Sequence, residues 1–407
     1  MDIVDDGQAV GYLRELAGQQ GLDVVAGAVR RSSSRFCLGV EHGDYNGTEL
    51  FGVGTDRFIW MSYKPNGSDR VRIYSGNFPD DGVVEFTLGN VPEPKSVHES
   101  WARFPYGVDY VLHREGMKLD KGFDAVLYGN IPGGGMSRSA SLSLNLILSM
   151  LDVNGIAVED QFKIVDLAQA VENDYIGSPC GQLDQIMILF AKEGMGTHYN
   201  PKAQSIDYVP LGEGATDFRI VGLDTGTVRG GLEKSTYKIR RAECDKLVEL
   251  AKAAGFDITC LADIKDERLY GKVLAEFEES HPDLCDRMTY IYKAQKRFYE
   301  MMDAWKAGDI ETVGAIFRED GFGLRDEYKI SGDELETMCD IVRRVDGTLG
   351  ERMLGGGDKG ASGALVRADS VDAVKAAVDS EYPKRQPDYA DKYAVHVCRT
   401  VDGMKVF

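Results

Sequence analysis

A glycine-rich stretch in the first half of the chain has the residue types of a phosphate-binding loop. Three consecutive glycines, Gly133–Gly135, precede the serine-containing run Met136–Ser141. Such glycines let the backbone approach an anion and turn its N–H groups toward it, and the serine hydroxyls can reach phosphate oxygens or a bound Mg²⁺. The stretch lacks the lysine of a P-loop and is not a GxGxxG motif. A tight turn before a serine-capped helix explains these residues equally well.

Two other groups of polar residues could bind a sugar or catalyse a transfer. Arg35 precedes the residues Glu41, His42 and Asp44, which lead into an Asn-Gly turn. Because carboxylates accept several hydrogen bonds at once, these residues suit a polyhydroxylated ligand, with an exposed polar turn as the alternative. Asp184 lies between a Gly/Pro-containing turn and an apolar run. It is either a half-buried catalytic carboxylate or an acid that the dipole favours at a helix N-terminus.

The glycine loop needs elements on both sides to hold it. The apolar run Ala125–Tyr128 predicts a strand before it, and the leucine-rich run Leu142–Leu151 predicts a buried helix after it. A helix N-terminus adds unpaired N–H groups and the positive end of the helix dipole, so this layout favours phosphate binding. A further helix is predicted over about residues 158–175, and it contains Glu172.

The second half of the chain differs from the first in composition and in its pattern of predicted elements. Phe218–Asp224 predicts a strand, and a second glycine loop, Gly355–Gly363, leads into another strand-like run. The change in composition and a glycine-rich stretch near residue 212 predict one domain over residues 1–212 and a second over 213–407. A chain of 407 residues is long enough for two or three domains with substantial cores.

Composition narrows the classes of partner. The formal net charge of −19 argues against nucleic acid and against an anionic membrane, because both require a basic face. The seven cysteines contain no CxxC pair, and the start of the chain has neither a basic nor an apolar leader segment, so we expect a cytoplasmic protein with reduced thiols. The six histidines show no HExxH spacing, which makes a zinc site unexpected.

Three separated motifs together resemble the GHMP small-molecule kinase superfamily, and within it the galactokinase family. Glu-His-x-Asp-Tyr-Asn-Gly at residues 41–47 matches the family's sugar signature, and Cys-Gly-Gln-Leu-Asp-Gln at 180–185 is similar to its C-G-x-M-D-Q. Ser235-x-Tyr237-x-x-Arg-Arg-x-x-Cys244 is the third match. The two glycine loops match the remaining superfamily motifs more loosely, and the order of all five fits nearly the whole chain.

The resemblance implies a role for each matching residue. Asp184 stands where the family has its catalytic carboxylate, facing the anomeric hydroxyl of the sugar, and Arg35 where it has an arginine beside the transferring phosphoryl group. The matches to sugar-binding positions are Glu41, His42, Asp44 and Tyr237. The matches to Mg²⁺ ligands are Ser139 and Glu172. The matches to the ATP triphosphate cradle are Gly133, Gly134, Gly135, Met136, Ser137, Arg138 and Ser139.

The resemblance also implies the fold and the reaction. We expect an α+β protein of two domains, the first similar to the second domain of ribosomal protein S5 and the second ferredoxin-like, with the active site in the cleft between them. The implied reaction is ATP- and Mg²⁺-dependent phosphorylation of the anomeric hydroxyl of galactose, giving galactose 1-phosphate and ADP. The implied partners are a sugar and ATP, bound by a monomer or weak homo-oligomer.

Two alternatives to galactose phosphorylation stay open. One is another GHMP sugar 1-kinase, acting on galacturonate, arabinose or an N-acetylhexosamine, and the other is a galactokinase-like sugar sensor without turnover. Glu41 favours a neutral hydroxymethyl group at C6, because a uronate would meet a second carboxylate. The chain departs from the family in four places: Cys37 replaces an asparagine, the phosphate loop is one residue shorter after Pro132, Arg138 interrupts a serine triplet, and Asp358-Lys359 replaces Phe-Gly. These changes bear on nucleotide preference and rate more than on the fold.

Overall fold

The computed structural model describes residues 3, 5–97, 100–228 and 236–407. The strands of its larger sheet are β1 (Ala28–Gly39), β2 (Leu50–Pro65), β3 (Arg70–Ser75), β4 (Val83–Thr87), β5 (Phe123–Gly129), β6 (Met195–Asn200), β7 (Ser205–Pro210) and β12 (Met404–Val406). The strands of its smaller sheet are β8 (Phe218–Asp224), β9 (Thr348–Met353), β10 (Ala361–Arg367) and β11 (Ala394–Cys398). The predicted strand at 218–224 is β8, residue for residue.

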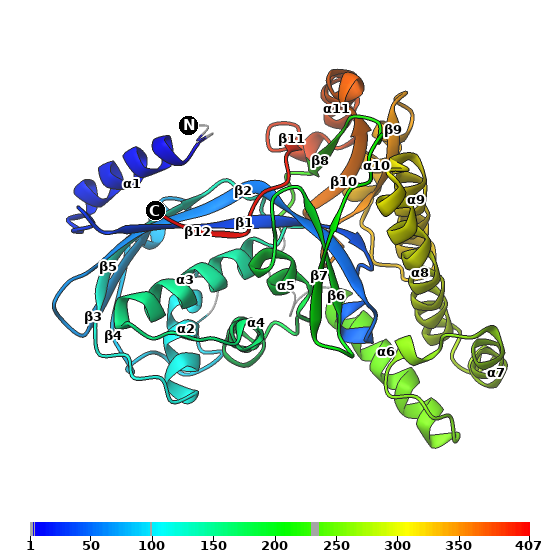
Figure 1. Cartoon of the computed structure of the whole chain (residues 1–407), viewed down its shortest axis with the longest axis horizontal. Helices are drawn as coiled ribbons and strands as arrows, with labels where there is room; N and C mark the ends of the chain where they lie inside the picture. The colour runs from blue at the N-terminus through cyan, green and yellow to red at the C-terminus, as the bar shows by residue number, and fades with distance from the viewer. Residues whose placement is uncertain (1–2, 4, 98–99, 229–235) are drawn as a thin grey trace.

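Among the described residues the larger sheet has eight strands and the smaller has four. The larger runs in the order β12-β1-β2-β5-β3-β4, and β6 continues it from β2 with β7 at its edge. The smaller runs β11-β8-β10-β9, with every neighbouring pair antiparallel. β1 and β2 are the long strands that cross most of the molecule (Figure 1). Arg35 is in the middle of β1, opposite Gly54.

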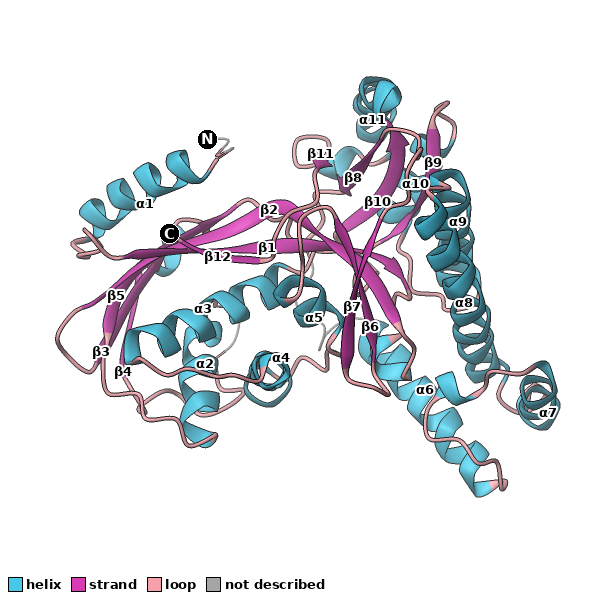
Figure 2. Cartoon of the chain, viewed as in Figure 1, coloured by secondary structure: helices cyan, strands magenta, loops and turns pink. Residues whose placement is uncertain are grey.

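Helices cover both faces of the larger sheet (Figure 2). They are α1 (Asp6–Gln20), α2 (Arg103–Arg114), α3 (Arg138–Asn154), α4 (Gln161–Ala170) and α5 (Leu183–Leu189). α1 lies on one face, where Leu13 and Leu16 pack with Trp60 of β2. At its N-terminus the carboxylate of Asp5 accepts a hydrogen bond from the N–H of Gln8 at 2.8 Å. At its C-terminus Gly21 ends the helix in the left-handed conformation. α2 to α5 lie on the other face, and α3 contains the leucine-rich run predicted as a buried helix.

The smaller sheet and the remaining helices form the other end of the molecule (Figure 1). These helices are α6 (Thr236–Ala253), α7 (Glu267–Phe277), α8 (Pro282–Ala307), α9 (Ile310–Asp326), α10 (Asp333–Arg343) and α11 (Val371–Arg385). α10 and α11 bury their apolar sides on the sheet, where Val342 and Val378 join Val221 in one hydrophobic cluster. α9 lies close against β9, since a Cβ on Gly350 would be 1.9 Å from the carbonyl oxygen of Gly314. Within the described ranges, no helix has the length and apolar character needed to span a bilayer.

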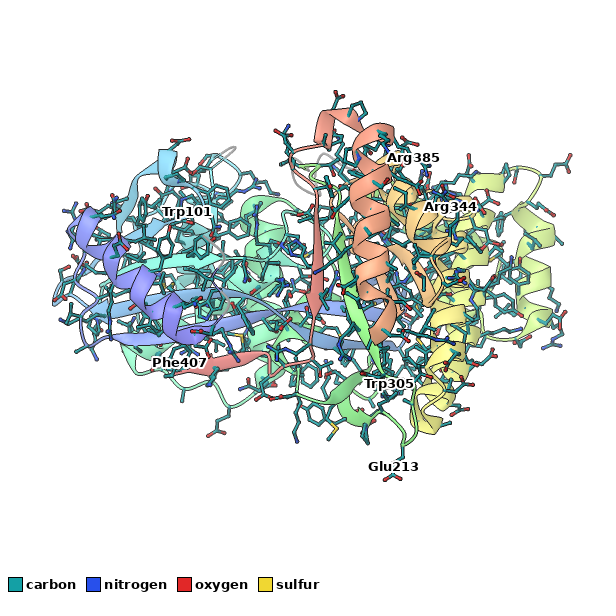
Figure 3. All side chains as sticks on the ribbon, turned by 90° about the horizontal axis from the view of Figure 1, so that it is seen from above. Trp101, Glu213, Trp305, Arg344, Arg385 and Phe407 are labelled. Carbon is teal, nitrogen blue, oxygen red and sulfur yellow. The ribbon has the colours of Figure 1, made fainter. Side chains whose placement is uncertain are left out.

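The end of the chain returns to the larger sheet. β12 pairs with β1, and Phe407 and Val29 exchange two backbone hydrogen bonds of 3.0 Å. Figure 3 shows Phe407 on the side of the molecule that carries α1. The boundary between residues 212 and 213 stays a prediction, and the larger sheet takes strands from both sides of it.

Candidate active site

A buried arginine and a half-exposed aspartate form the centre of the site. Arg35 is 1% exposed, and its Nε and Nη2 donate to Oδ1 of Asp184 at 2.9 and 2.7 Å. Its Nη1 donates to the carbonyl oxygen of Gly135 at 2.7 Å. Although burial lowers it, attraction to Asp184 and Glu41 raises the pKa of Arg35 above its ordinary value. One guanidinium thus joins the predicted catalytic carboxylate to the predicted phosphate loop.

Asp184 has its place at the start of α5, and its carboxylate is 35% exposed. The other residues around Arg35 are almost completely enclosed, so this carboxylate is the part of the pair that a bound molecule can reach. A charged group that is partly open to ligand and held by a bidentate donor suits a proton acceptor or an orienting group in a transfer reaction.

Glu41 is the next buried group of the site and is 3% exposed. Its Oε1 is 3.6 Å from Nη2 of Arg35, and its Oε2 is 3.1 Å from Nη1 of Arg352. Arg352, which comes from β9 just before the second glycine loop, was not predicted from the sequence. Because two arginines lie next to Glu41, this carboxylate would repel a uronate less than expected.

An aromatic group lies beside Glu41. His42 stands in the left-handed backbone region at a φ of 61°, with its ring 5.2 Å from that of Tyr237 on α6. Nδ1 of His42 is 2.9 Å from the hydroxyl of Tyr45, which is 2.7 Å from the hydroxyl of Tyr328. Burial raises the pKa of Tyr237 well above its usual value, so this hydroxyl keeps its proton. The structure therefore brings two predicted sugar-binding residues, His42 and Tyr237, together. Ser235 of the same motif lies outside the described residues.

Asp44 faces the loop before α5. Its Oδ2 accepts a hydrogen bond from the N–H of Leu183 at 3.1 Å, and a Cβ on Gly181 would lie 1.9 Å from the same oxygen. Burial raises the pKa of Asp44 to about 6, the Leu183 N–H lowers it, and Asp184 raises it further. A pocket of about 150 Å³ opens here, with Asp44, Gly181 and Arg241 in its lining. The absence of a side chain at Gly181 leaves room for the carboxylate.

The first glycine loop packs against the second. A Cβ on Gly134 would be 2.9 Å from Cα of Gly360, and one on Gly135 would be 2.8 Å from the carbonyl oxygen of Ala361. A Cβ on Gly133, in contrast, would meet nothing within 4 Å. Two of the three glycines are therefore needed for contact between loops, and the third borders open space. Met136 is fully buried in the same loop.

The start of α3 leaves polar groups available to a ligand. Ser137 precedes the helix with a φ of 64° and gives it no side-chain cap. Within the described part of the chain, the buried hydroxyl of Ser137 has no hydrogen-bond partner, and Ser139 follows in the first helical turn. An uncapped helix start beside an orphaned hydroxyl is a suitable anion site.

Arg138, which interrupts the family's serine triplet, packs beside this helix start. Its guanidinium carbon is 5.5 Å from the ring centre of Phe78. Burial lowers the pKa of Arg138, and attraction to Asp224 opposes that effect. Asp358, another departure, accepts a hydrogen bond from the N–H of Thr236 at 2.6 Å, at the start of α6. That carboxylate is therefore used to hold a helix end.

Glu172 lies in a π-helical turn, Val171–Ile176, which follows α4. The predicted continuous helix over 158–175 is thus interrupted at this residue; such turns occur frequently at functional sites. Glu172 is 5% exposed, and its Oε1 is 3.5 Å from Nε2 of Gln185, the neighbour of Asp184 on α5. Hydroxyl and carboxylate oxygens are the ligands that Mg²⁺ prefers, so Ser139 and Glu172 are of the right type.

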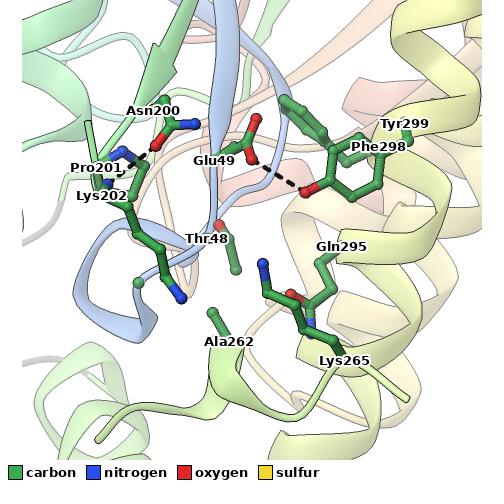
Figure 4. Close-up of a pocket in the computed structure, with 11 residues that line it drawn as sticks. Thr48, Glu49, Asn200, Pro201, Lys202, Ala262, Lys265, Gln295, Phe298 and Tyr299 are labelled. Atoms are coloured by element: carbon green, nitrogen blue, oxygen red, sulfur yellow. Dashed lines mark hydrogen bonds between the residues drawn. The ribbon is translucent and has the colours of Figure 1, made fainter. Parts of the chain in front are cut away.

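A second pocket, of about 190 Å³, borders the turn that follows Asp44. Figure 4 shows Lys202 and Lys265 reaching toward it from opposite sides. Glu49 lines it too, with its carboxylate accepting a hydrogen bond from the hydroxyl of Tyr299 at 3.0 Å. The pocket adjoins the sugar-signature turn but contains none of the predicted site residues.

Known proteins similar to this chain agree with the motifs. Residues 104–192 match the family model described as GHMP kinases N terminal domain. A galactokinase of Clostridium acetobutylicum is 30% identical over 389 residues, which cover 92% of this chain and 93% of that protein. A galactokinase of Streptococcus mutans is 31% identical, over 86% of this chain and 88% of its own length.

Solved structures give the same result for the fold. Galactokinase from Lactococcus lactis, determined as a complex with galactose, matches with a TM-score of 0.88 at 28% identity, over 97% of this chain and 99% of its own. Mevalonate kinase from Methanococcus jannaschii matches with a TM-score of 0.62 at 14% identity, over 92% of this chain and 99% of its own. The predicted α+β GHMP kinase fold is therefore confirmed, and this chain, a sugar kinase, belongs to the galactokinase family.

Proposed function

We propose that this protein transfers the γ-phosphoryl group of ATP to the anomeric hydroxyl of galactose, giving galactose 1-phosphate and ADP. The observation that carries the proposal is the Arg35–Asp184 pair, which joins the phosphate loop at Gly135 to the sugar-signature residues around Glu41. ATP, the phosphoryl donor, and the sugar, the acceptor, must meet at one point, and the contacts of Arg35 and Asp184 support a meeting point beside this pair.

The residues divide the work of the reaction. Asp184 accepts or orients the proton of the anomeric hydroxyl, whose oxygen attacks the phosphorus atom. Arg35 places positive charge where charge develops on the phosphoryl oxygens. Asp44, His42 and Tyr237 bind sugar hydroxyls, and the N–H groups after Gly133 together with the Ser137 hydroxyl hold the triphosphate.

Mg²⁺ is proposed as the metal of the reaction, held by Ser139 and Glu172. The orphaned Ser137 hydroxyl and the uncapped α3 start support a phosphate group next to Ser139, and hard oxygen ligands fit this cation. When bound, Mg²⁺ would supply positive charge that neutralises the charge on phosphate oxygens. The chain's own contribution is to fix two ligand oxygens on α3 and on the π-helical turn.

Galacturonate is a second candidate substrate. The observation that favours it is the pairing of Glu41 with both Arg35 and Arg352, which reduces the repulsion that a uronate at C6 would meet. Galactose remains the first candidate because relatives named galactokinase match nearly the whole chain.

The variant Asp184→Asn tests the assignment of the central pair. We expect ADP release to fall by at least about 100-fold, because an amide cannot accept the anomeric proton, while galactose affinity by calorimetry stays within about tenfold. Asp184→Glu keeps the charge and should retain more turnover than the amide. Turnover of Asp184→Asn close to that of the natural protein would contradict the assignment.

A further inference from the structure

Arg352 is a buried arginine that the roles above leave unused. It is 1% exposed on β9, in the smaller sheet, and reaches the larger sheet. Its Nη2 donates to the carbonyl oxygen of Cys37 at 2.9 Å, and its Nη1 is 3.1 Å from Oε2 of Glu41. Its guanidinium carbon lies 4.4 Å from the ring centre of Phe317. Three neighbours on different elements therefore fix the position of this side chain.

Arg352 belongs to a line of alternating charges that leads to Asp184. It contacts Glu41, Glu41 is 3.6 Å from Arg35, and Arg35 contacts Asp184 at 2.7 Å. The contact of Glu41 with Arg352 is shorter than its contact with Arg35 by half an ångström, as the two distances of 3.1 and 3.6 Å give. In a site closed to water, charge attraction at these distances is strong enough to decide which partner a carboxylate approaches.

We propose that Arg352 is a positioning residue for phosphoryl transfer, which holds Glu41 back so that Arg35 stays on Asp184. The inference rests on the proposed function, since it concerns the pair that the transfer uses. Among the described residues no contact joins Arg352 to Asp184, so Arg352 acts on the Arg35–Asp184 pair through Glu41.

Removing Arg352 has a predictable consequence. Glu41 would stay buried with Arg35 as its remaining cationic neighbour on this line, and a buried carboxylate that has lost one of two cationic partners draws the other toward it. Arg35 would then shift its Nη2 from Asp184 to Glu41. Because displacement of a catalytic group by about 1 Å costs up to about 100-fold in rate, the effect should appear in kcat.

The neighbouring residue on β9 supplies a matched structural control. Glu351 points to the other side of the strand, where it is completely buried and pairs with Arg318 at 2.8 Å and Arg343 at 2.6 Å. Arg343→Met removes an arginine from a buried carboxylate of the same strand without touching the charge line. It therefore measures the general cost of such a loss.

The test compares kcat at saturating sugar for Arg352→Met, Glu41→Gln, their combination and Arg343→Met, using the sugar that the natural protein phosphorylates fastest. We expect Arg352→Met to lower kcat at least tenfold, and Arg343→Met to keep it within about twofold despite a similar fall in Tm. In the combined variant the carboxylate charge is gone, so its kcat should match that of Glu41→Gln within about twofold and exceed that of Arg352→Met about fivefold or more.

Arg352→Lys guards against a variant that fails to fold. Lysine keeps a charge near Glu41 but lacks the planar fork whose two nitrogens meet Glu41 and the Cys37 carbonyl. Its kcat should therefore lie between those of the natural protein and Arg352→Met, or be at least severalfold below that of the natural protein if the methionine variant is insoluble. The inference is overturned if Arg352→Met or Arg352→Lys leaves kcat unchanged, or if losses in the double variant simply multiply. If the natural protein is active and the variants behave in either of these ways, the role of Arg352 is refuted while the proposed function stands. If the natural protein phosphorylates only another sugar, galactose is refuted as the substrate while the role of Arg352 stands. If it phosphorylates no sugar, the proposed function and the role of Arg352 are both refuted.

Discussion

Asp44 is the site residue whose ionisation should set the acid limit of the reaction. Its pKa is raised to about 6, mainly by burial, and protonation turns one of its two acceptor oxygens into a donor, which weakens its hydrogen bonds with sugar hydroxyls. We therefore expect kcat/KM for galactose to fall as the pH drops through about 6, while it stays level just above that pH. The measurement is a pH profile of kcat/KM, which reports groups of the free enzyme.

Two variants identify the group behind the acid limb of this profile, which is the fall in kcat/KM below about pH 6. Asp44→Asn should weaken galactose use and remove the acid limb. Asp109→Asn should keep it, because burial also raises the pKa of Asp109 to about 6 but that residue lies on α2, outside the site. The pH dependence of stability tests the same pKa. Because the pKa of Asp44 is raised, the folded state binds more protons than the unfolded state between about pH 4 and 6, and the free energy of unfolding falls as the pH rises through that range. This fall should be smaller in Asp44→Asn. A limb that survives in Asp44→Asn would contradict the assignment.

At the scale of elements, the contact between the two glycine loops keeps the phosphate site in shape. Gly134→Ala would force a methyl group to within 2.9 Å of Cα of Gly360, and backbone there can yield only by moving a loop. We expect a loss of about 1–3 kcal/mol in stability and a higher KM for ATP. Denaturant unfolding and ATP kinetics measure these two effects.

Gly133→Ala is the matched control for the loop contact. Apart from its chain neighbours, no described residue has an atom within 4 Å of a Cβ at that position, so stability should change by less than about 0.5 kcal/mol. Its KM for ATP then reports whether the open side of Gly133 faces the nucleotide. Equal destabilisation by both alanines would refute the contact as the reason for Gly134.

Elements with strong local patterns were predictable from sequence, and long-range pairs were not. The strand Phe218–Asp224 and the buried helix after the first glycine loop follow from apolar periodicity. The π-helical turn at Glu172 has no such signature, because one extra residue in a helical turn leaves the composition unchanged. The motifs predicted that Arg35 and Asp184 belong to one site, and the structure places their side chains 2.7 Å apart. Arg352 was not predicted, because its partner Glu41 is 311 residues away in the sequence and a single arginine in a strand does not by itself indicate a functional site.

At the scale of the whole molecule, the pairing of β12 with β1 should stabilise the larger sheet. β12 covers part of β1 and Phe407 bonds to Val29, so removing residues 404–407 exposes backbone groups of that strand. We expect a lower Tm and more aggregation, with kcat of the remaining folded protein little changed because Arg35 lies farther along β1. Differential scanning fluorimetry and light scattering test this, and an unaltered Tm would show that β12 adds no stability.

The most direct test of galactose phosphorylation is an ADP-release assay with Mg·ATP over galactose, galacturonate, arabinose, glucose and N-acetylgalactosamine. We expect turnover on galactose, with a kcat/KM at least about tenfold above that for each other sugar, which corresponds to about 1.4 kcal/mol of transition-state discrimination. A higher kcat/KM on another sugar would contradict galactose as the substrate. No turnover on any of the five, with galactose binding still measurable by calorimetry, would contradict phosphoryl transfer itself and identify a sugar sensor with a kinase fold.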